Sequence, residues 1–216
     1  MVRPISEIRR PEIVRATIDA LGKKGLPQLS YDTIAGEADM SRQLIRHYFP
    51  DPEELMVSVC DALAALYKDL LTQGILEANT AQRLPMFLDF YFGLAAPANL
   101  RKPQDDQVYD ALMSLAAGSD AVKSSLRDQY QLLQFTVAHE VQISHPGLSQ
   151  RACAEIGYLF VSLMYGHWKM VASLGFDPAM NAVSRSAMDR IIQSYLDRYD
   201  DPDTAEKPLP PEGAEG

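Results

Sequence analysis

The segment 41–48, with the sequence SRQLIRHY, carries side chains that are suited to recognise nucleic acid. Arginine and glutamine can form paired hydrogen bonds with the edges of guanine and adenine, and Arg42, Gln43 and Arg46 lie within about two helical turns. Ser41 and the free backbone amides of a helix start are suited to bind a phosphate. The alternative interpretation is an ordinary polar helix face in contact with solvent.

A helix over 42–48 would have two different faces. Ile45 and Phe49 point to one side, with Tyr48 at the edge of that side. The opposite face and its flanks contain the polar candidates and one leucine, namely Arg42, Gln43, Leu44, Arg46 and His47. One face would therefore pack against the protein, while the other would be free to enter a DNA groove.

Three closely spaced helix starts would position this segment. Ser30, Ser41 and Asp51 are each suited to cap a helix, and each lies between flanking residues that fit a hydrophobic staple. The pattern predicts short helices over 31–38 and 42–48, joined by a turn at 39–40, followed by a long helix from Pro52. Two short helices with such a turn form a helix-turn-helix, whose second helix enters the major groove.

Residues 9–60 resemble the DNA-binding domain of the TetR (tetracycline-repressor-like) family of transcription regulators. The resemblance is carried by RRPEIVRATIDALGKKG and LSYDTIAGEADMSRQLIRHYFPDPEEL. It implies phosphate contacts by Ser30, Thr33 and Tyr48, and groove contacts by Arg42, Gln43, Leu44, Arg46 and His47. It also implies a homodimer whose recognition helices, about 34–36 Å apart, read a palindromic operator. A small-molecule effector in the C-terminal domain would release this repressor from DNA.

The sequence departs from the family pattern at several positions. Pro52 stands where many members have a phosphate-binding lysine, and Asp32 stands where a basic residue is frequent. Asp39 replaces a turn glycine at a small cost, because aspartate tolerates a left-handed conformation. Gln43 and Arg46 replace residues that are often small or aromatic, which adds groups able to read bases. Fewer phosphate contacts predict a shallower dependence of DNA binding on salt.

Charge and composition agree with a DNA-binding segment at the start of the chain. The 216 residues have a net charge of −9, yet residues 1–50 hold eight Lys/Arg against six Asp/Glu. An acidic protein is unsuited to coat nucleic acid indiscriminately, so an anionic partner is expected only near the N-terminus. Without a signal-peptide core or a membrane-spanning stretch, we expect a cytoplasmic protein. Cys60 and Cys153 are expected to be buried thiols.

Helical periodicity continues to about residue 199, so the predicted fold class is all-α. We expect an N-terminal three-helix bundle with the helix-turn-helix over 1–51 and a helical effector-binding and dimerisation domain over 52–200. A first helix is expected to begin at Pro11. The later helices are expected at 52–76, 80–96, 104–117, 119–144, 149–174 and 179–199. Residues 201–216 are acidic and proline-rich, and are expected to be a disordered tail.

Aromatic residues and methionines at helical spacing suggest an effector pocket in the second domain. The candidates are Phe87, Tyr91, Tyr109, Met113, Phe135, His139, Met164, His167 and Trp168. Ordinary core packing explains most of them equally well, and a buried histidine can be satisfied by the protein itself. His139 and His145 lie six residues apart and so do not share a helix face, and we expect neither a metal site nor a cofactor.

Helices 149–174 and 179–199 are the predicted dimer interface. Gly157 and Gly166 lie inside the first of them, where glycine costs roughly 1 kcal/mol relative to alanine. Close approach of another helix would justify this cost, and a contact within one chain is the alternative. We find no catalytic constellation, so an enzyme is not expected. A DNA-binding regulator without an effector remains an alternative, and an all-helical ligand carrier or enzyme is a further one.

Overall fold

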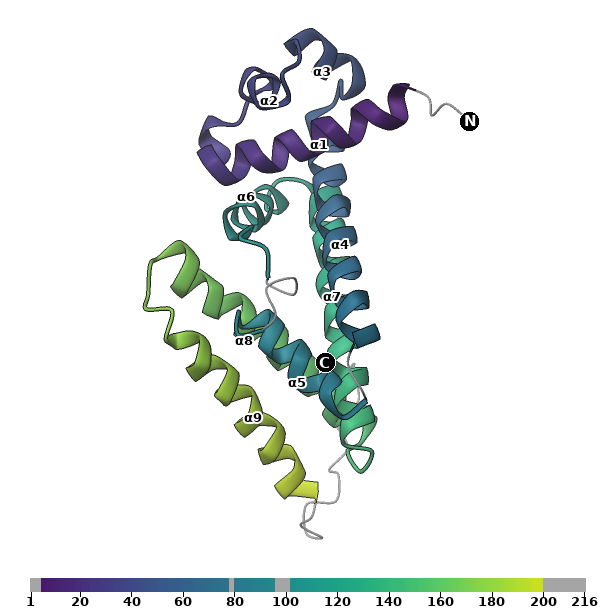
Figure 1. Cartoon of the computed structure of the whole chain (residues 1–216), viewed down its shortest axis with the longest axis vertical. Helices are drawn as coiled ribbons and strands as arrows, with labels where there is room; N and C mark the ends of the chain where they lie inside the picture. The colour runs from purple at the N-terminus through teal and green to yellow at the C-terminus, as the bar shows by residue number, and fades with distance from the viewer. Residues whose placement is uncertain (1–4, 78–79, 96–101, 200–216) are drawn as a thin grey trace, which may run out of the picture.

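The computed structural model describes residues 5–77, 80–95 and 102–199, and the regular structure within these ranges is entirely helical. This confirms the predicted fold class. The helices are α1 (Ile5–Lys24), α2 (Tyr31–Ala38), α3 (Arg42–Tyr48), α4 (Pro52–Glu77), α5 (Thr80–Tyr91), α6 (Asp106–Ala116), α7 (Asp120–Ser144), α8 (Gln150–Trp168) and α9 (Met180–Tyr199). Helices α1–α3 form one end of the molecule, and α4 and α7 run along its length (Figure 1). The predicted tail lies outside the described residues.

Local capping fixes the two short helices as the sequence predicts. The Ser30 hydroxyl accepts a hydrogen bond from the Thr33 amide at 3.2 Å, and the Thr33 hydroxyl accepts one from the Ser30 amide at 2.8 Å. The Ser41 hydroxyl accepts a bond from the Leu44 amide at 3.2 Å. Between these helices Asp39 adopts a left-handed conformation, with a φ of 51°. These bonds satisfy amides that would otherwise lack a helical partner.

The first helix begins at Ile5 and not at Pro11, which lies inside α1. The expectation that Pro11 starts the helix was therefore wrong. Long-range contacts hold this earlier part of α1 in place. Nη1 of Arg10 donates a hydrogen bond to the Tyr48 carbonyl at 2.7 Å, and its guanidinium carbon lies 4.0 Å from the centre of the Phe49 ring.

The expected helix 80–96 also ends early, because α5 stops at Tyr91. Gly93 follows with a φ of +68°. This left-handed conformation ends the helix, and glycine adopts it more readily than other residues. A Cβ atom at this position would lie 3.1 Å from both Trp168 and Asn181. The chain therefore turns here because α8 and α9 approach its backbone closely.

Two apolar cores lie one after the other along the molecule. The first joins α1–α4 to α6 and the start of α7, and includes Ile13, Leu21, Ile45, Phe49, Leu63, Val108, Leu112 and Leu126. The second joins α5, α7, α8 and α9, and includes Phe87, Phe92, Val141, Ile156, Phe160 and Met188. Helix α6 is thus packed into the same core as the helix-turn-helix.

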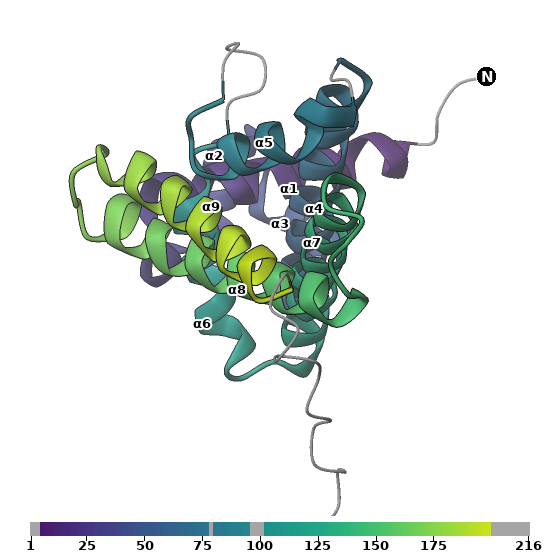
Figure 2. The same ribbon diagram turned by 90° about the horizontal axis from the view of Figure 1, so that it is seen from below.

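Helices α8 and α9 pack side by side, as both views show (Figure 1, Figure 2). Gly157 of α8 faces α7 within the same chain, where an added Cβ would lie 2.5 Å from the Gln134 carbonyl oxygen. The intramolecular alternative therefore explains Gly157. Gly166 meets no described atom within 4 Å of such a Cβ, so close approach within the chain does not explain it. Both cysteines are buried free thiols, and no described helix is long and apolar enough to cross a membrane.

Candidate DNA-binding helix and internal cavity

Helix α3 exposes its polar face and buries its apolar one. Ile45 and Phe49 have no solvent exposure, while Tyr48 and Leu44 are half-buried. The exposed positions are Ser41, Arg42, Gln43, Arg46 and His47, with Ser30 exposed and Thr33 half-buried on the neighbouring helix. The structure thus gathers the nine predicted DNA-contacting residues on α2, α3 and their caps.

Contacts from α1 and α2 hold α3 in this orientation. The Tyr31 hydroxyl donates a hydrogen bond to the Phe49 carbonyl at 2.9 Å, next to the Arg10 bond to Tyr48. Arg10 also pairs with Glu54 in the first turn of α4. The end of α3 is therefore bound directly by α1 and α2, and Arg10 links it to α4, so these contacts set the orientation of its exposed face.

One of the candidate arginines already has an acidic partner. Nη1 of Arg42 lies 3.2 Å from Oδ2 of Asp32, and both side chains are exposed. A surface pair of this kind contributes little to stability. The pair lowers the local positive charge, however. Among the described residues, Arg46 is therefore the arginine of α3 whose guanidinium has no acidic partner.

A cavity of about 340 Å³ lies between α4, α5, α6, α7 and α8. Its walls are mostly aromatic and aliphatic. The lining residues include Tyr67, Leu71, Phe87, Tyr91, Tyr109, Tyr130, Leu133, Met164, Tyr165 and Trp168, together with Lys68, Lys102, Asp106, Gln129 and Lys169. The volume and the few polar groups are typical of a site for a small organic molecule.

Five of the nine predicted pocket residues line this cavity: Phe87, Tyr91, Tyr109, Met164 and Trp168. The other four lie elsewhere. Met113, Phe135 and His139 are exposed, and 62% of Phe135 is accessible to solvent. His167 is buried beside the cavity and is satisfied by the protein.

Two side chains of α9 bind the His167 ring. Its Nε2 lies 3.1 Å from Oδ1 of Asn181, and its Nδ1 lies 2.9 Å from the Ser184 hydroxyl. Burial lowers the pKa of His167, and the bond to Asn181 opposes this shift. The neutral ring therefore joins α8 to α9 rather than reaching the cavity.

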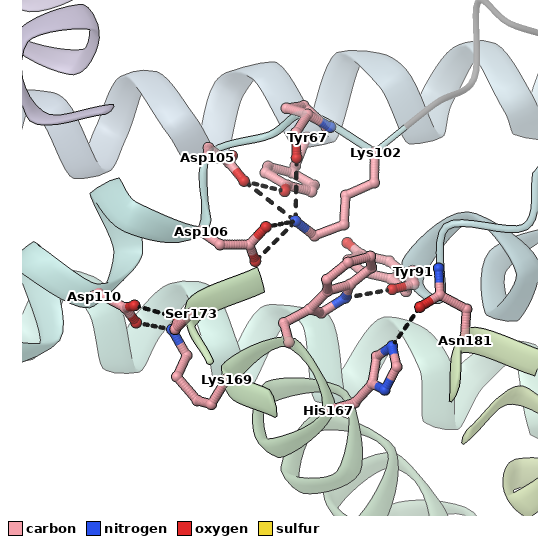
Figure 3. A network of polar contacts seen from close by, with 12 residues as sticks. Tyr67, Tyr91, Lys102, Asp105, Asp106, Asp110, His167, Lys169, Ser173 and Asn181 are labelled. Carbon is pink, nitrogen blue, oxygen red and sulfur yellow. Dashed lines mark hydrogen bonds and ion pairs between the residues drawn. The ribbon is translucent and has the colours of Figure 1, made fainter. Parts of the chain in front are cut away.

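The polar end of the cavity contains residues that were not among the predicted site residues. Nζ of Lys102 lies 3.0 and 3.1 Å from the two carboxylate oxygens of Asp106, and 3.4 Å from Oδ1 of Asp105 (Figure 3). The Tyr67 hydroxyl donates to the same Asp105 oxygen at 3.0 Å. Burial raises the pKa of Asp105, while the ammonium of Lys102 opposes this shift. The lysine pairs with aspartates three and four residues ahead, but its place beside the cavity also depends on Tyr67 of α4 and Trp168 of α8, which the local sequence does not indicate.

A second ion pair links the end of α8 to α6. Lys169 begins a π-helical segment, Lys169–Ser173, and pairs with Asp110 of α6 (Figure 3). The Ser173 hydroxyl donates to the other Asp110 oxygen at 2.6 Å. Burial lowers the pKa of Lys169. This segment lies at a helix end that periodicity alone would extend as regular α-helix.

Comparison with known proteins points to one family. No protein-family model matches the chain. The HTH-type transcriptional regulator BetI of Escherichia coli O17:K52:H18 is 23% identical over 199 residues, which cover 89% of this chain and 96% of that protein. The BetI protein of Klebsiella pneumoniae is 22% identical, over 88% of this chain and 94% of that protein.

Solved structures share the fold along most of the chain. A TetR transcription regulator from Haloarcula marismortui has a TM-score of 0.72 at 18% identity, over 88% of this chain and 98% of that one. A TetR-family regulator from Cytophaga hutchinsonii has a TM-score of 0.75 at 14% identity, over 90% and 98% of the two chains. A regulator from Saccharomonospora viridis, solved in complex with choline, has a TM-score of 0.70 at 15% identity, over 87% and 96%.

The observed helices and the similar proteins indicate the same architecture over most of the chain: an N-terminal helix-turn-helix followed by a helical domain. Regulators of this kind act by binding DNA and are not enzymes. The chain has the fold of TetR-family regulators and is similar along most of its length to the transcriptional regulator BetI.

Proposed function

We propose that the chain is a repressor that binds a palindromic operator as a homodimer and leaves it when a small molecule occupies the cavity. The position of α6 carries this proposal. Asp106 and Tyr109 of α6 line the cavity, while Val108 and Leu112 are buried in the core shared with α1–α4. A ligand that shifts α6 would therefore act directly on the helices that position α3.

On the DNA side, we assign base contacts in the major groove to Gln43, Arg46 and His47. These side chains are exposed and share one face of α3. Arg42 and Leu44 flank the groove face. Phosphate contacts belong to groups at or near helix starts and at the end of α3, namely Ser30, Thr33, Ser41 and Tyr48, because free amides and hydroxyls there suit an anion.

Control by a ligand requires that the ligand binds two conformations of the protein with different affinities. The contacts around α6 supply such a difference. Asp106 is held by Lys102, and Asp110 is held by Lys169 and Ser173 of the π-helical segment. A molecule that enters the cavity beside Asp106 and Tyr109 would change these contacts and move α6 with them.

Two solved relatives of this fold hold small molecules, which supports an effector-controlled regulator over one without an effector. The Saccharomonospora viridis regulator is in complex with choline, and the multidrug-binding protein EbrR is complexed with malachite green. EbrR has a TM-score of 0.58 at 19% identity, over 85% of this chain and 97% of that one.

We place the dimer interface on α8 and α9. Tyr158 of α8 and Val183 of α9 are large apolar residues with 61% and 52% of their surfaces exposed, and Leu159 and Met180 are also exposed. Exposed apolar side chains on neighbouring helices favour burial against a partner. A two-fold axis along these helices would present two copies of α3 to successive major grooves.

The DNA-binding half of the proposal is tested with an operator selected from random duplexes by the purified protein. We expect Arg46→Ala to weaken binding to the selected operator by about 1–3 kcal/mol and to relax preference at one base pair. Arg127→Ala, on an exposed position of α7, is the matched control and should bind as the wild type does. A uniform loss for all sequences would instead assign Arg46 to a phosphate.

Dimerisation and effector control are tested by separate measurements. Sedimentation at micromolar concentration should give a dimer, and a species of 24.0 kDa would contradict it. Compounds that bind the protein in calorimetry should lower its operator affinity in the same buffer. Effector control fails if cavity-binding compounds leave operator affinity unchanged.

A further inference from the structure

We propose that the cavity selects an uncharged molecule with a largely apolar body and one or two hydrogen-bond acceptors, such as a ketone, ester or amide. This inference rests on the proposed function, because it names the chemical class of the effector. It follows from two features of the lining: its largely buried ammonium groups already have carboxylate partners, and several of its phenol hydroxyls have no partner.

The two largely buried ammonium groups beside the cavity already have carboxylate partners. Nζ of Lys102, with 7% of its side chain exposed, binds Asp105, Asp106 and the Pro103 carbonyl. Lys169 binds Asp110. Lys68 is the remaining cation of the lining, and it is exposed to solvent. An anionic ligand would therefore compete with aspartates that are already in place, and would pay its full desolvation cost.

A cation meets an equivalent obstacle at the aromatic walls. Nζ of Lys102 lies 4.4 Å from the centre of the Trp168 ring, and Nζ of Lys169 lies 5.0 Å from the centre of the Tyr165 ring. Aromatic faces attract cations at such distances. These two faces already hold the protein's own ammonium groups, which would repel an ammonium ligand.

Four tyrosines of the lining have hydroxyls that are available to form hydrogen bonds with a ligand. Among the described residues, no protein group forms a hydrogen bond with the hydroxyl of Tyr91, Tyr109, Tyr130 or Tyr165. These oxygens are also not among the buried atoms that lack a partner, so each keeps accessible surface. Only 4% of Tyr91 is exposed, and that residue lines the cavity, so its hydroxyl opens into the cavity.

These phenols act as donors. Burial raises the pKa of Tyr91, Tyr109 and Tyr130, so each keeps its proton at neutral pH. Tyr67 differs, because its hydroxyl already donates to Asp105. A carbonyl or ether oxygen accepts a hydrogen bond without bringing a charge into the cavity. The rest of the lining, including Leu71, Phe87, Leu133 and Met164, would cover an apolar body.

The test compares four probes that share a biphenyl body, by calorimetry on the full chain. They are 4-acetylbiphenyl, 4-ethylbiphenyl, biphenyl-4-carboxylate and biphenyl-4-yltrimethylammonium. We expect the ketone to bind at least about tenfold more tightly than either ion, because only the ions lose charge hydration. The proposal is overturned if either ion binds as tightly as the ketone, or if none of the four binds.

Tyrosine variants then locate the donors. Tyr109→Phe and Tyr130→Phe should each weaken ketone binding about 3- to 10-fold, the effect of one neutral hydrogen bond, and leave 4-ethylbiphenyl binding unchanged. Ser124→Ala removes a hydroxyl from an exposed position of α7 outside the cavity and should change neither. Equal weakening of the ketone and the hydrocarbon would show a packing effect and contradict the assignment. Operator affinity is measured separately: an ion that binds more tightly and releases DNA overturns the ligand class but leaves effector control intact.

Discussion

The carbonyl oxygen of Gln134 occupies the space that a side chain at Gly157 would need. An added Cβ at Gly157 would lie 2.5 Å from this oxygen and 3.3 Å from Cβ of Ala138. Helices α7 and α8 therefore approach each other at backbone distance, and this contact sets the spacing of the long helices around the cavity.

We expect Gly157→Ala to destabilise the protein by about 1–3 kcal/mol, because the backbone of α7 must shift to relieve the overlap. Gly166→Ala is the matched control in the same helix, since a Cβ there meets nothing within 4 Å. It should stabilise the chain by up to about 1 kcal/mol through helix propensity. Urea unfolding of both variants measures the difference, and equal effects at the two positions would contradict the contact.

Arg10 is expected to position the recognition helix α3 without touching DNA. Its guanidinium joins the Tyr48 carbonyl, the Phe49 ring and the Glu54 carboxylate. Arg10→Ala should lower stability by about 1–3 kcal/mol and also weaken operator binding, since the end of α3 loses its attachment to α1 and α4. Arg9→Ala removes only a surface pair with Glu12 and should change both measurements little. Intact operator affinity in Arg10→Ala would refute the positioning role.

The Lys169–Asp110 pair should hold α6 against the end of α8. Asp110→Asn leaves a half-buried ammonium without its carboxylate and should cost about 1–3 kcal/mol in thermal unfolding. Asp69→Asn, at an exposed position of α4, is the control and should have little effect. If α6 transmits ligand binding, Asp110→Asn should also change the ratio of operator affinities with and without 4-acetylbiphenyl. A ratio equal to that of the wild type would exclude this pair from the transmission.

Stability should fall in mild acid because of His167. Its pKa in the folded protein lies below the ordinary value of 6.5, mainly through burial. The unfolded chain therefore binds the proton more readily, so stability is complete above about pH 6.5 and is lost as the pH falls towards the lower folded pKa. His167→Asn should show a smaller loss of melting temperature between about pH 7.5 and 5.5 than the wild type. His139→Asn, at an exposed position, should keep the full loss, and an unchanged slope in His167→Asn would contradict the assignment.

The parts of the fold that depend on near neighbours were predictable from the sequence. Ser30 and Ser41 cap helices by accepting hydrogen bonds from amides three residues ahead, so their roles could be predicted from the local sequence. Ile45 and Phe49 are buried because helical spacing places them on one face. Pro11 misled the prediction because its local preference for a helix start was overridden by contacts of Arg10 with the end of α3.

The cavity was only partly predictable, for the opposite reason. Aromatic residues such as Tyr91 and Trp168 could be proposed as lining because their type and spacing suit a pocket. Phe135 has the same type and spacing, yet it faces solvent. The rotation of each helix about its axis decides which aromatic side chains point into the cavity. That rotation is set by packing against neighbouring helices.

By itself, the sequence determined the helices, their caps and the division of α3 into a buried and an exposed face, because these follow from contacts within a few residues. Only the tertiary structure decided that Lys102 meets Asp105 and Asp106 beside Trp168, and that Lys169 reaches Asp110. Lys102 and the two aspartates are close in the sequence, but Trp168 belongs to α8, and Lys169 and Asp110 lie far apart in the chain. The long-range contacts therefore depend on how the helices pack. The same packing leaves the tyrosine hydroxyls facing a cavity whose largely buried ammonium groups already have carboxylate partners.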